Sequence, residues 1–122
     1  MTSCLVIDHS PALRTVARRI LEEIGYKVTG AGDGMAALRA CRETMPDLIF
    51  LDWNLPHMTG LEFVKALRGL PGGEHPQILY STTEMSTKQI ATAKAAGADE
   101  FVIKPFDRTQ VRSKLSAIGL AA

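Results

Sequence analysis

Residues 48–56, LIFLDWNLP, place an aspartate at the end of an apolar run and a proline shortly after it. The run from residue 48 to residue 51 is apolar at every position, which is typical of a strand buried on both faces. Pro56 lacks the N–H that a central strand needs, so the strand has to end before it. Asp52 is therefore either a turn or capping residue, or part of a functional site at the edge of a sheet.

The composition is that of an ordinary globular domain. The chain has 122 residues, of which 46% are hydrophobic and 22% are charged. Its 14 Lys and Arg nearly balance 13 Asp and Glu, so neither nucleic acid nor an anionic membrane is an expected partner. The sequence shows no apolar run of transmembrane length and no secretory signal pattern, so the expected location is the cytoplasm. Cys4 and Cys41 match no metal-binding or redox motif.

Apolar runs alternate with segments of helical periodicity along the whole chain. Five strands are expected, at residues 4–7, 26–30, 48–51, 77–82 and 100–104. Because helices separate strands that are apolar on both faces, the pattern indicates an α/β fold with a parallel sheet covered on both sides. No linker or repeat interrupts this pattern, so residues 1–122 are expected to form one domain with no output domain.

Five helices are expected between and after these strands. Each begins at a residue whose side chain can cap its first turn, and two have a capping-box partner three residues later. These residues are Ser10, Asp33, Thr59 with Glu62, Ser86 with Gln89, and Asp107. In the first helix one face collects the apolar residues Leu13, Val16, Ile20, Leu21 and Ile24.

The fourth helix, which ends at Gly97, carries Ile90 and several alanines but little large apolar surface. Two interpretations follow. The helix is held less firmly than the others because it buries less area, or it sits close to the sheet because alanine is small. The first interpretation makes it the element most able to shift.

Four polar residues follow the apolar runs at the ends of four strands: Asp8, Asp52, Thr82 and Lys104. Ligands of an open parallel sheet bind outside the carboxyl ends of its strands, so these side chains are expected to meet. A carboxylate can act as a nucleophile toward phosphorus, and phosphoryl transfer needs positive charge and hydrogen-bond donors around the transferred group. Lys104 and Thr82 supply these, and Mg²⁺ can bridge the carboxylates to a phosphoryl group.

Four stretches together resemble the receiver domain of two-component response regulators: CLVIDHS (4–10), PDLIFLDWNLPHMTGLEF (46–63), ILYSTTE (78–84) and GADEFVIKPF (97–106). The resemblance covers nearly the whole chain. It implies a single flavodoxin-like (βα)5 domain with the strand order 2-1-3-4-5. Because nothing follows the receiver, the chain is most similar to the stand-alone regulators of the chemotaxis type.

The resemblance implies a role for each site residue. Asp52 would accept a phosphoryl group from a histidine kinase or phosphotransfer protein, Thr82 would turn its hydroxyl toward it, and Lys104 would pair with it. Asp8, Asp52 and the backbone carbonyl of Asn54 would hold Mg²⁺. The protein would catalyse only its own phosphoryl transfer and dephosphorylation, and would not act as an enzyme on outside substrates.

The resemblance also implies an output. Phe101 stands where the family has an aromatic residue that swings inward on activation, and Asn54 and Glu84 match positions that tune the loss of phosphate. The Lys104–Pro105 bond matches a peptide bond that is often cis. A downstream target protein would bind the face made by the fourth helix, the fifth strand and the fifth helix.

One position departs from the family pattern. Receivers usually carry two acidic residues where this chain has Asp8 and His9. Imidazole is a poor ligand for a hard cation, so we expect weaker Mg²⁺ binding. His9 either blunts phosphorylation and leaves a degenerate, phosphorylation-independent interaction module, or it is tolerated, or it points outward. A transition-metal site that uses His9 is the least favoured reading, since His57 and His75 add no cluster by spacing.

Two other functions remain open at this point. Asp52 could serve a true hydrolase, although the chain offers no cap domain or substrate pocket. Five helix arginines could bind a nucleotide second messenger, although arginines on helix faces are usually solvated: Arg14, Arg18, Arg19, Arg108 and Arg112.

Overall fold

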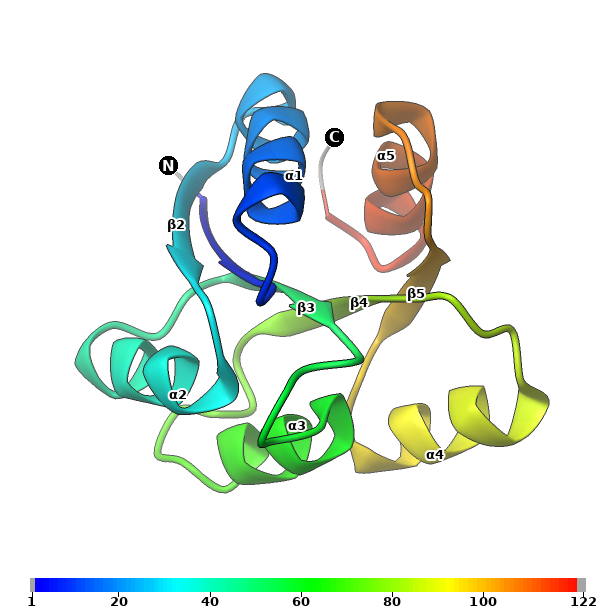
Figure 1. The fold of residues 1–122 in the computed structure, drawn as a ribbon. Coiled ribbons are helices and arrows are strands. Elements are labelled where there is room, and N and C mark those ends of the chain that lie inside the picture. Colours follow the sequence, from blue (N-terminus) through cyan, green and yellow to red (C-terminus); the bar gives the residue numbers. More distant parts are fainter. Residues whose placement is uncertain (1, 121–122) are drawn as a thin grey trace.

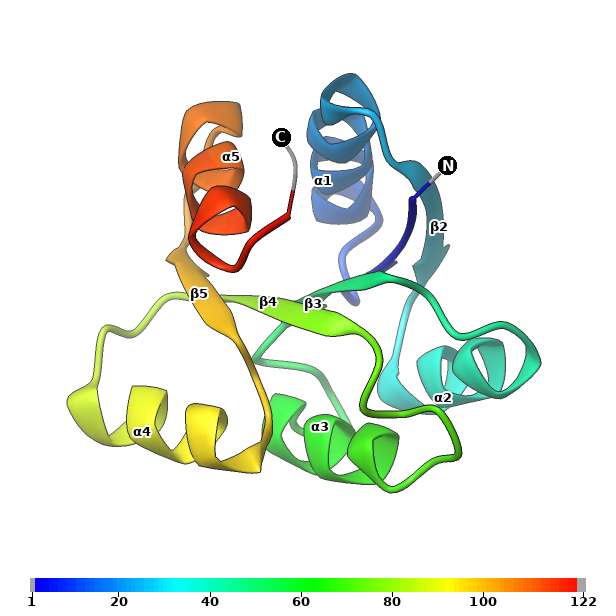
Figure 2. The ribbon, with the colours of Figure 1, turned by 180° about the vertical axis from the view of Figure 1, so that it is seen from behind.

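A five-stranded parallel sheet separates two layers of helices in the computed structural model, which describes residues 2–120 (Figures 1 and 2). The strand order is β2-β1-β3-β4-β5, which confirms the expected fold. The strands are β1 (Ser3–Ile7), β2 (Lys27–Ala31), β3 (Leu48–Asp52), β4 (Gln77–Thr82) and β5 (Glu100–Ile103). One face is covered by α1 (Pro11–Ile24) and α5 (Arg108–Ala117), and the other by α2 (Gly34–Glu43), α3 (Gly60–Arg68) and α4 (Thr87–Ala96). None of the helices within residues 2–120 has the length and apolar character needed to cross a membrane.

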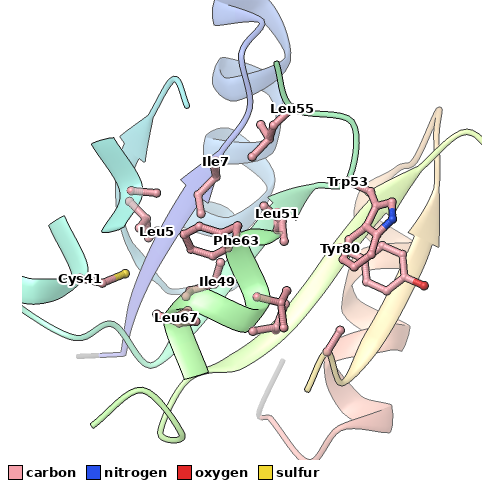
Figure 3. Close-up of a cluster of buried hydrophobic side chains, with 14 of the residues drawn as sticks. Leu5, Ile7, Cys41, Ile49, Leu51, Trp53, Leu55, Phe63, Leu67 and Tyr80 are labelled. Atoms are coloured by element: carbon pink, nitrogen blue, oxygen red, sulfur yellow. The ribbon is translucent and has the colours of Figure 1, made fainter. Parts of the chain in front are cut away.

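The central strand β3 supplies both hydrophobic cores, because its side chains alternate between the two faces of the sheet. Ile49 and Leu51 join the core beneath α2, α3 and α4, where Phe63 is fully buried (Figure 3). Leu48 and Phe50 join the core beneath α1 and α5. All five residues of β3 are buried, including Asp52. The continuous apolar run is thus the consequence of burial on both faces.

The expected capping residues begin the five helices. Thr59 and Glu62 form the full capping box of α3, and Asp107 forms one with Gln110 in α5. The prediction for α4 is only half right. Ser86 accepts a hydrogen bond from the Gln89 N–H, but the Gln89 side chain donates to the Glu84 carboxylate at 3.4 Å. The side-chain oxygen of Gln89, which would accept from the Ser86 N–H in a capping box, has no hydrogen-bond partner among the described residues.

Helix α1 buries only part of the face that the sequence predicts. Leu21 is fully buried and Ile20 and Ile24 pack against the core, whereas Leu13 and Val16 are 38% and 45% exposed. Two arginines of α1 contact the backbone beside the helix. Arg14 donates to the Asp8 carbonyl at 2.6 Å and Arg18 to the Val28 carbonyl at 3.2 Å.

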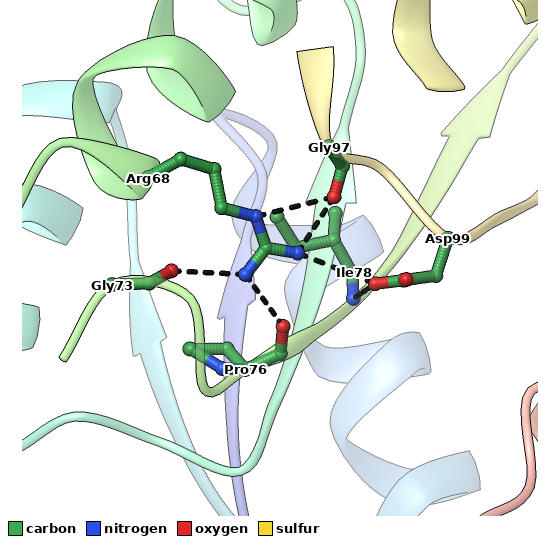
Figure 4. A network of polar contacts seen from close by, with 6 residues as sticks. All are labelled: Arg68, Gly73, Pro76, Ile78, Gly97 and Asp99. Atoms are coloured by element: carbon green, nitrogen blue, oxygen red, sulfur yellow. Dashed lines mark hydrogen bonds and ion pairs between the residues drawn. The ribbon is translucent and has the colours of Figure 1, made fainter. Parts of the chain in front are cut away.

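Helix α4 is attached unevenly. Ala93 is its one fully buried residue, as the alanine-rich sequence predicts. Its C-terminal end is fixed by Arg68 of α3, which donates through Nε and Nη2 to the Gly97 carbonyl at 3.2 and 2.6 Å (Figure 4). Nη1 of the same guanidinium donates to the carbonyls of Gly73 and Pro76. One side chain therefore ties the end of α4 to α3 and to the loop before β4.

Arg68→Lys tests this attachment. A single ammonium cannot serve three carbonyls in different directions, so we expect a loss of about 2 kcal/mol in the free energy of unfolding, since hydrogen bonds to charged groups contribute about 1.5–3 kcal/mol. Urea unfolding measures the loss, and amide exchange should rise most around Gly97. The control is Arg108→Lys, since the Arg108–Glu23 pair is 59% and 57% exposed. That change should stay within about 0.5 kcal/mol. Equal effects of the two substitutions would contradict the assignment.

Candidate functional site

The carboxyl edge of the sheet brings together the four polar residues that the sequence placed at strand ends. Asp52 and Thr82 are the last residues of β3 and β4, while Asp8 and Lys104 follow β1 and β5. Backbone bonds continue past the strands: the Lys104 N–H donates to the Thr82 carbonyl at 2.8 Å and the Asp8 N–H to the Ala31 carbonyl at 3.2 Å. The site is therefore built on rigid strand ends and not on free loops.

An ion pair joins two of these residues. Lys104 Nζ lies 2.8 Å from Asp52 Oδ1 and 4.0 Å from Asp8 Oδ2. Asp52 is only 4% exposed and Asp8 only 7% exposed, so both carboxylates have largely lost their hydration. An ionised carboxylate in such a place needs a cation or hydrogen-bond donors to compensate. Lys104 supplies the cation for both.

Each carboxylate is also held by one backbone N–H. The Ser10 N–H donates to Asp8 Oδ1 at 2.9 Å, and the Asn54 N–H donates to Asp52 Oδ1 at 3.0 Å. The Oδ1 atoms are thereby fixed, and Asp52 Oδ2 has no hydrogen bond from the described part of the chain. The arrangement leaves one oxygen of Asp52 available for a ligand or for covalent chemistry.

The charge on Asp8 is unfavourable in this setting. Burial raises the pKa of the Asp8 carboxyl above its usual value, and the neighbouring negative charge of Asp52 raises it further. The Ser10 N–H, Lys104 and His9 act in the opposite direction. The net direction is upward, so the ionised form of Asp8 costs the fold stability.

Thr82 and Phe101 differ in how far they are buried. Thr82 is fully buried, and its hydroxyl oxygen accepts a bond from the Glu84 N–H at 3.2 Å, which leaves the hydroxyl proton free to be donated. Phe101 is half-buried beside Tyr80, with Lys114 Nζ 4.6 Å from its ring centroid. The side chains of Asn54 and Glu84 are exposed at the rim. The Lys104–Pro105 peptide bond is cis, as the resemblance implies.

His9 does not point away from the site. A ring nitrogen of His9 and carboxylate oxygens of Asp8 and Asp52 all lie within 4.8 Å of one another. The possibility that His9 faces outward is therefore excluded. The two buried carboxylates fit the oxygen-seeking Mg²⁺ ion, whereas the imidazole does not. Within residues 2–120 these three side chains form the one group of metal-ligating type.

An aromatic pair that the sequence-based predictions did not include lies beneath the site. The rings of Trp53 and Tyr80 lie 4.4 Å apart between their centroids (Figure 3). Gly60 allows α3 to approach, since a Cβ atom there would lie 2.6 Å from the Trp53 ring. The Tyr80 hydroxyl is buried and has no hydrogen-bond partner among the described residues. Strand alternation could have placed Tyr80 next to Trp53, but no local signal shows an unsatisfied hydroxyl.

The fold and the site define a flavodoxin-like α/β domain with a charged pocket at a strand edge. The chain belongs to the response regulator receiver domain family, whose profile matches residues 4–116. It is 30% identical over 115 residues to the chemotaxis protein CheY-3 of Vibrio cholerae, covering 93% of this chain and 88% of that protein. The match to the chemotaxis protein CheY of Pseudomonas aeruginosa is 31%, covering 93% of each chain.

The comparison of structures agrees. The crystal structure of CheY4 from Vibrio cholerae superimposes with a TM-score of 0.91 at 36% identity, over 97% of this chain and 98% of that one. The receiver domain of a sensor histidine kinase from Pseudomonas aeruginosa, solved with a magnesium ion in its active site cleft, gives a TM-score of 0.84 at 27% identity. That match covers 97% of this chain and 98% of the other.

Asp8→Asn should stabilise the protein at neutral pH. Because the folded-state pKa of Asp8 is raised, the ionised carboxylate destabilises the fold above that pKa, and the penalty disappears below the ordinary value of 3.8. The variant should therefore unfold at a higher urea concentration at pH 7, and its advantage should vanish in acid.

Asp47→Asn provides a control of opposite sign. The Ser3 backbone N–H, and after it the His75 side chain, lower the pKa of Asp47. Its ionised form stabilises the fold above the ordinary pKa, and this contribution is lost as the pH falls through the folded-state pKa. Asp47→Asn should therefore lose stability at neutral pH. The same sign for both variants at pH 7 would contradict the account of Asp8.

Tyr80→Phe tests the buried hydroxyl. A buried polar group without a partner costs roughly 1–3 kcal/mol, so its removal from a site that keeps its ring packing should raise the free energy of unfolding by about 1 kcal/mol. Thermal and urea unfolding measure the change. A clear loss of stability would show that the hydroxyl has a partner in solution.

Proposed function

We propose that this protein is a response regulator of a two-component phosphorelay that acts in the cytoplasm. Asp52 accepts a phosphoryl group from a histidine kinase or phosphotransfer protein, and the phosphorylated form binds a downstream target protein. The observation that carries this proposal is the buried Asp52 carboxylate with Lys104 Nζ at 2.8 Å, beside the buried Thr82 at the same edge. Membership of the receiver family and the similarity to chemotaxis proteins support it.

The proposed reaction transfers a phosphoryl group from a histidine nitrogen to a carboxylate oxygen of Asp52. Asp52 Oδ2 attacks phosphorus in line with the P–N bond of a phosphohistidine; the P–O bond forms as the P–N bond breaks, and the imidazole keeps the electron pair. Lys104 and the Thr82 hydroxyl meet the charge on the phosphoryl oxygens. Asp8, Asp52 and the backbone carbonyl of Asn54 are the proposed Mg²⁺ ligands, and the bound ion would add positive charge at the same oxygens.

The proposed output uses polar contacts that already link the site to α4. The Thr82 hydroxyl accepts from the Glu84 N–H, and the Glu84 carboxylate accepts from Gln89 in the first turn of α4. When the hydroxyl turns to donate to a phosphoryl oxygen, the loop between β4 and α4 loses this contact. Helix α4 buries only Ala93, so its first turn is free to move while Arg68 holds its other end. The surface of α4, β5 with Phe101, and α5 changes as a result.

A second candidate is a degenerate receiver that binds its partner without phosphorylation. The observation that favours it is the position of His9 within 4.8 Å of both carboxylates, where an imidazole replaces the acid that would help hold Mg²⁺. Weak metal binding would slow phosphoryl transfer, and the resting fold would then be the binding-competent state.

Intact mass spectrometry decides between these candidates. With a small acyl phosphate and a divalent cation, the wild-type protein should gain the mass of one phosphoryl group, and Asp52→Asn should gain none, since it removes the nucleophile. Asp47→Asn is the matched control because Asp47 is a carboxylate outside the site, and it should still gain the phosphoryl group. Equal uptake by Asp52→Asn would overturn the assignment of Asp52. No uptake by the wild-type protein with either Mg²⁺ or Mn²⁺ would favour the degenerate receiver.

A further inference from the structure

We infer that this site binds a transition-metal dication of the Co²⁺ to Zn²⁺ series in preference to Mg²⁺, with His9 as a direct ligand. The inference rests on the proposed function for the role of the site and deepens it, because the bound ion would decide when Asp52 can be phosphorylated. It is carried by the position of the His9 ring, which the spacing of the sequence did not predict.

The geometry suits one ion between three side chains. The donor atoms of Asp8, His9 and Asp52 lie within 4.8 Å of one another, whereas tetrahedral ligands of one ion would lie roughly 3.4 Å apart at metal–ligand distances of about 2.1 Å. The donor atoms therefore have to close by up to about 1.4 Å. Asp8 and Asp52 are buried and fixed by backbone N–H groups, while His9 is exposed in the bend between β1 and α1. The imidazole can move toward the ion while the carboxylates stay in place.

The donor set favours this class of ion. Mg²⁺ prefers six oxygen ligands and keeps much of its hydration, whereas imidazole nitrogen suits zinc, cobalt and related ions. Lys104 Nζ, 2.8 Å from Asp52 and 4.0 Å from Asp8, already offsets one of the two negative charges. The site then has one net negative charge, where a further acid in place of His9 would give it two, so it attracts Mg²⁺ less strongly. The bond between the metal and the imidazole nitrogen therefore contributes a larger share of the binding free energy.

The described chain contains another pair of an imidazole and a carboxylate, which serves as a control. His75 Nε2 lies 2.8 Å from Asp47 Oδ1 at the opposite edge of the sheet, and both side chains are exposed. This pair offers two donors in place of three. His75→Ala therefore removes an imidazole from the protein without touching the site.

Two readouts follow metal binding without any phosphoryl chemistry. Trp53, next to Asp52, is the single tryptophan, so its fluorescence reports on ions bound at the site. The visible absorption of Co²⁺ reports on the coordination geometry and ligand field of the bound ion, and its change in His9→Ala assigns the imidazole. In titrations of the full chain with Mg²⁺ and Co²⁺, Co²⁺ should bind at least about tenfold more tightly than Mg²⁺.

Variants at position 9 make the test specific. His9→Ala should weaken Co²⁺ binding by about tenfold and leave Mg²⁺ binding nearly unchanged, while His9→Asp should strengthen Mg²⁺ binding and reduce the preference. His75→Ala should change neither, and circular dichroism checks that each variant is folded. Equal Co²⁺ affinity of the wild-type protein and His9→Ala, or a preference of the wild-type protein for Mg²⁺, would overturn the inference.

The two proposals fail in different ways. Tight Co²⁺ binding that depends on His9, with no mass gain on Asp52 in any ion, would overturn the proposed function and support the metal site. Phosphorylation of Asp52 that saturates at the same Mg²⁺ concentration in the wild-type protein and His9→Asp would overturn the metal preference and support the proposed function.

Discussion

The structure depends on the compensation of two buried carboxylates by one ammonium. Asp52 and Lys104 are 52 residues apart in the sequence, and the strand order places β3 and β5 on the two sides of β4. Asp8 enters the same pocket from β1 on the other side of β3. Without Lys104, two negative charges would share a nearly dry site, which is strongly unfavourable. Burial also raises the pKa of Asp8, so the fold carries a local cost in stability at this edge.

Helix α4, which lies next to this edge, is held more firmly at its C-terminal end than at its first turn. The guanidinium of Arg68 holds the C-terminal end at Gly97, whereas the first turn is linked through Gln89, Glu84 and Thr82 to the strand edge. The contacts at the first turn are single hydrogen bonds between polar groups, and the helix contributes only Ala93 to the fully buried core. The C-terminal end of α4 is thus fixed more firmly than its first turn.

The sequence alone predicts those features of the structure that depend on a few neighbouring residues. The apolar run before Asp52, the capping residues Thr59 and Asp107, and the strand ends at Asp8 and Lys104 all behave as the pattern predicts, because each signal acts within a few residues. Three features could not be predicted from the sequence: the backbone contact of Arg14 in α1, the bond from Gln89 to Glu84, and the unsatisfied hydroxyl of Tyr80. Each depends on a partner that only the folded chain brings near, and helical periodicity contains no information about such partners.

The residue at position 9 changes both the net charge of the site and the donor atoms that it offers to a cation. Two carboxylates against one ammonium leave a single net negative charge, which is less than a pocket with a further acid would hold. A hard ion is held chiefly by charge, so it loses most from this change, whereas an ion that bonds well to nitrogen recovers part of the loss through the imidazole. The position of the His9 ring beside both carboxylates means that this exchange occurs inside the pocket and not on a distant surface. In the proposed site, the choice of metal would therefore follow from the residue at position 9, whereas Asp52, Lys104 and Thr82 keep the positions that the sequence predicts at the strand ends.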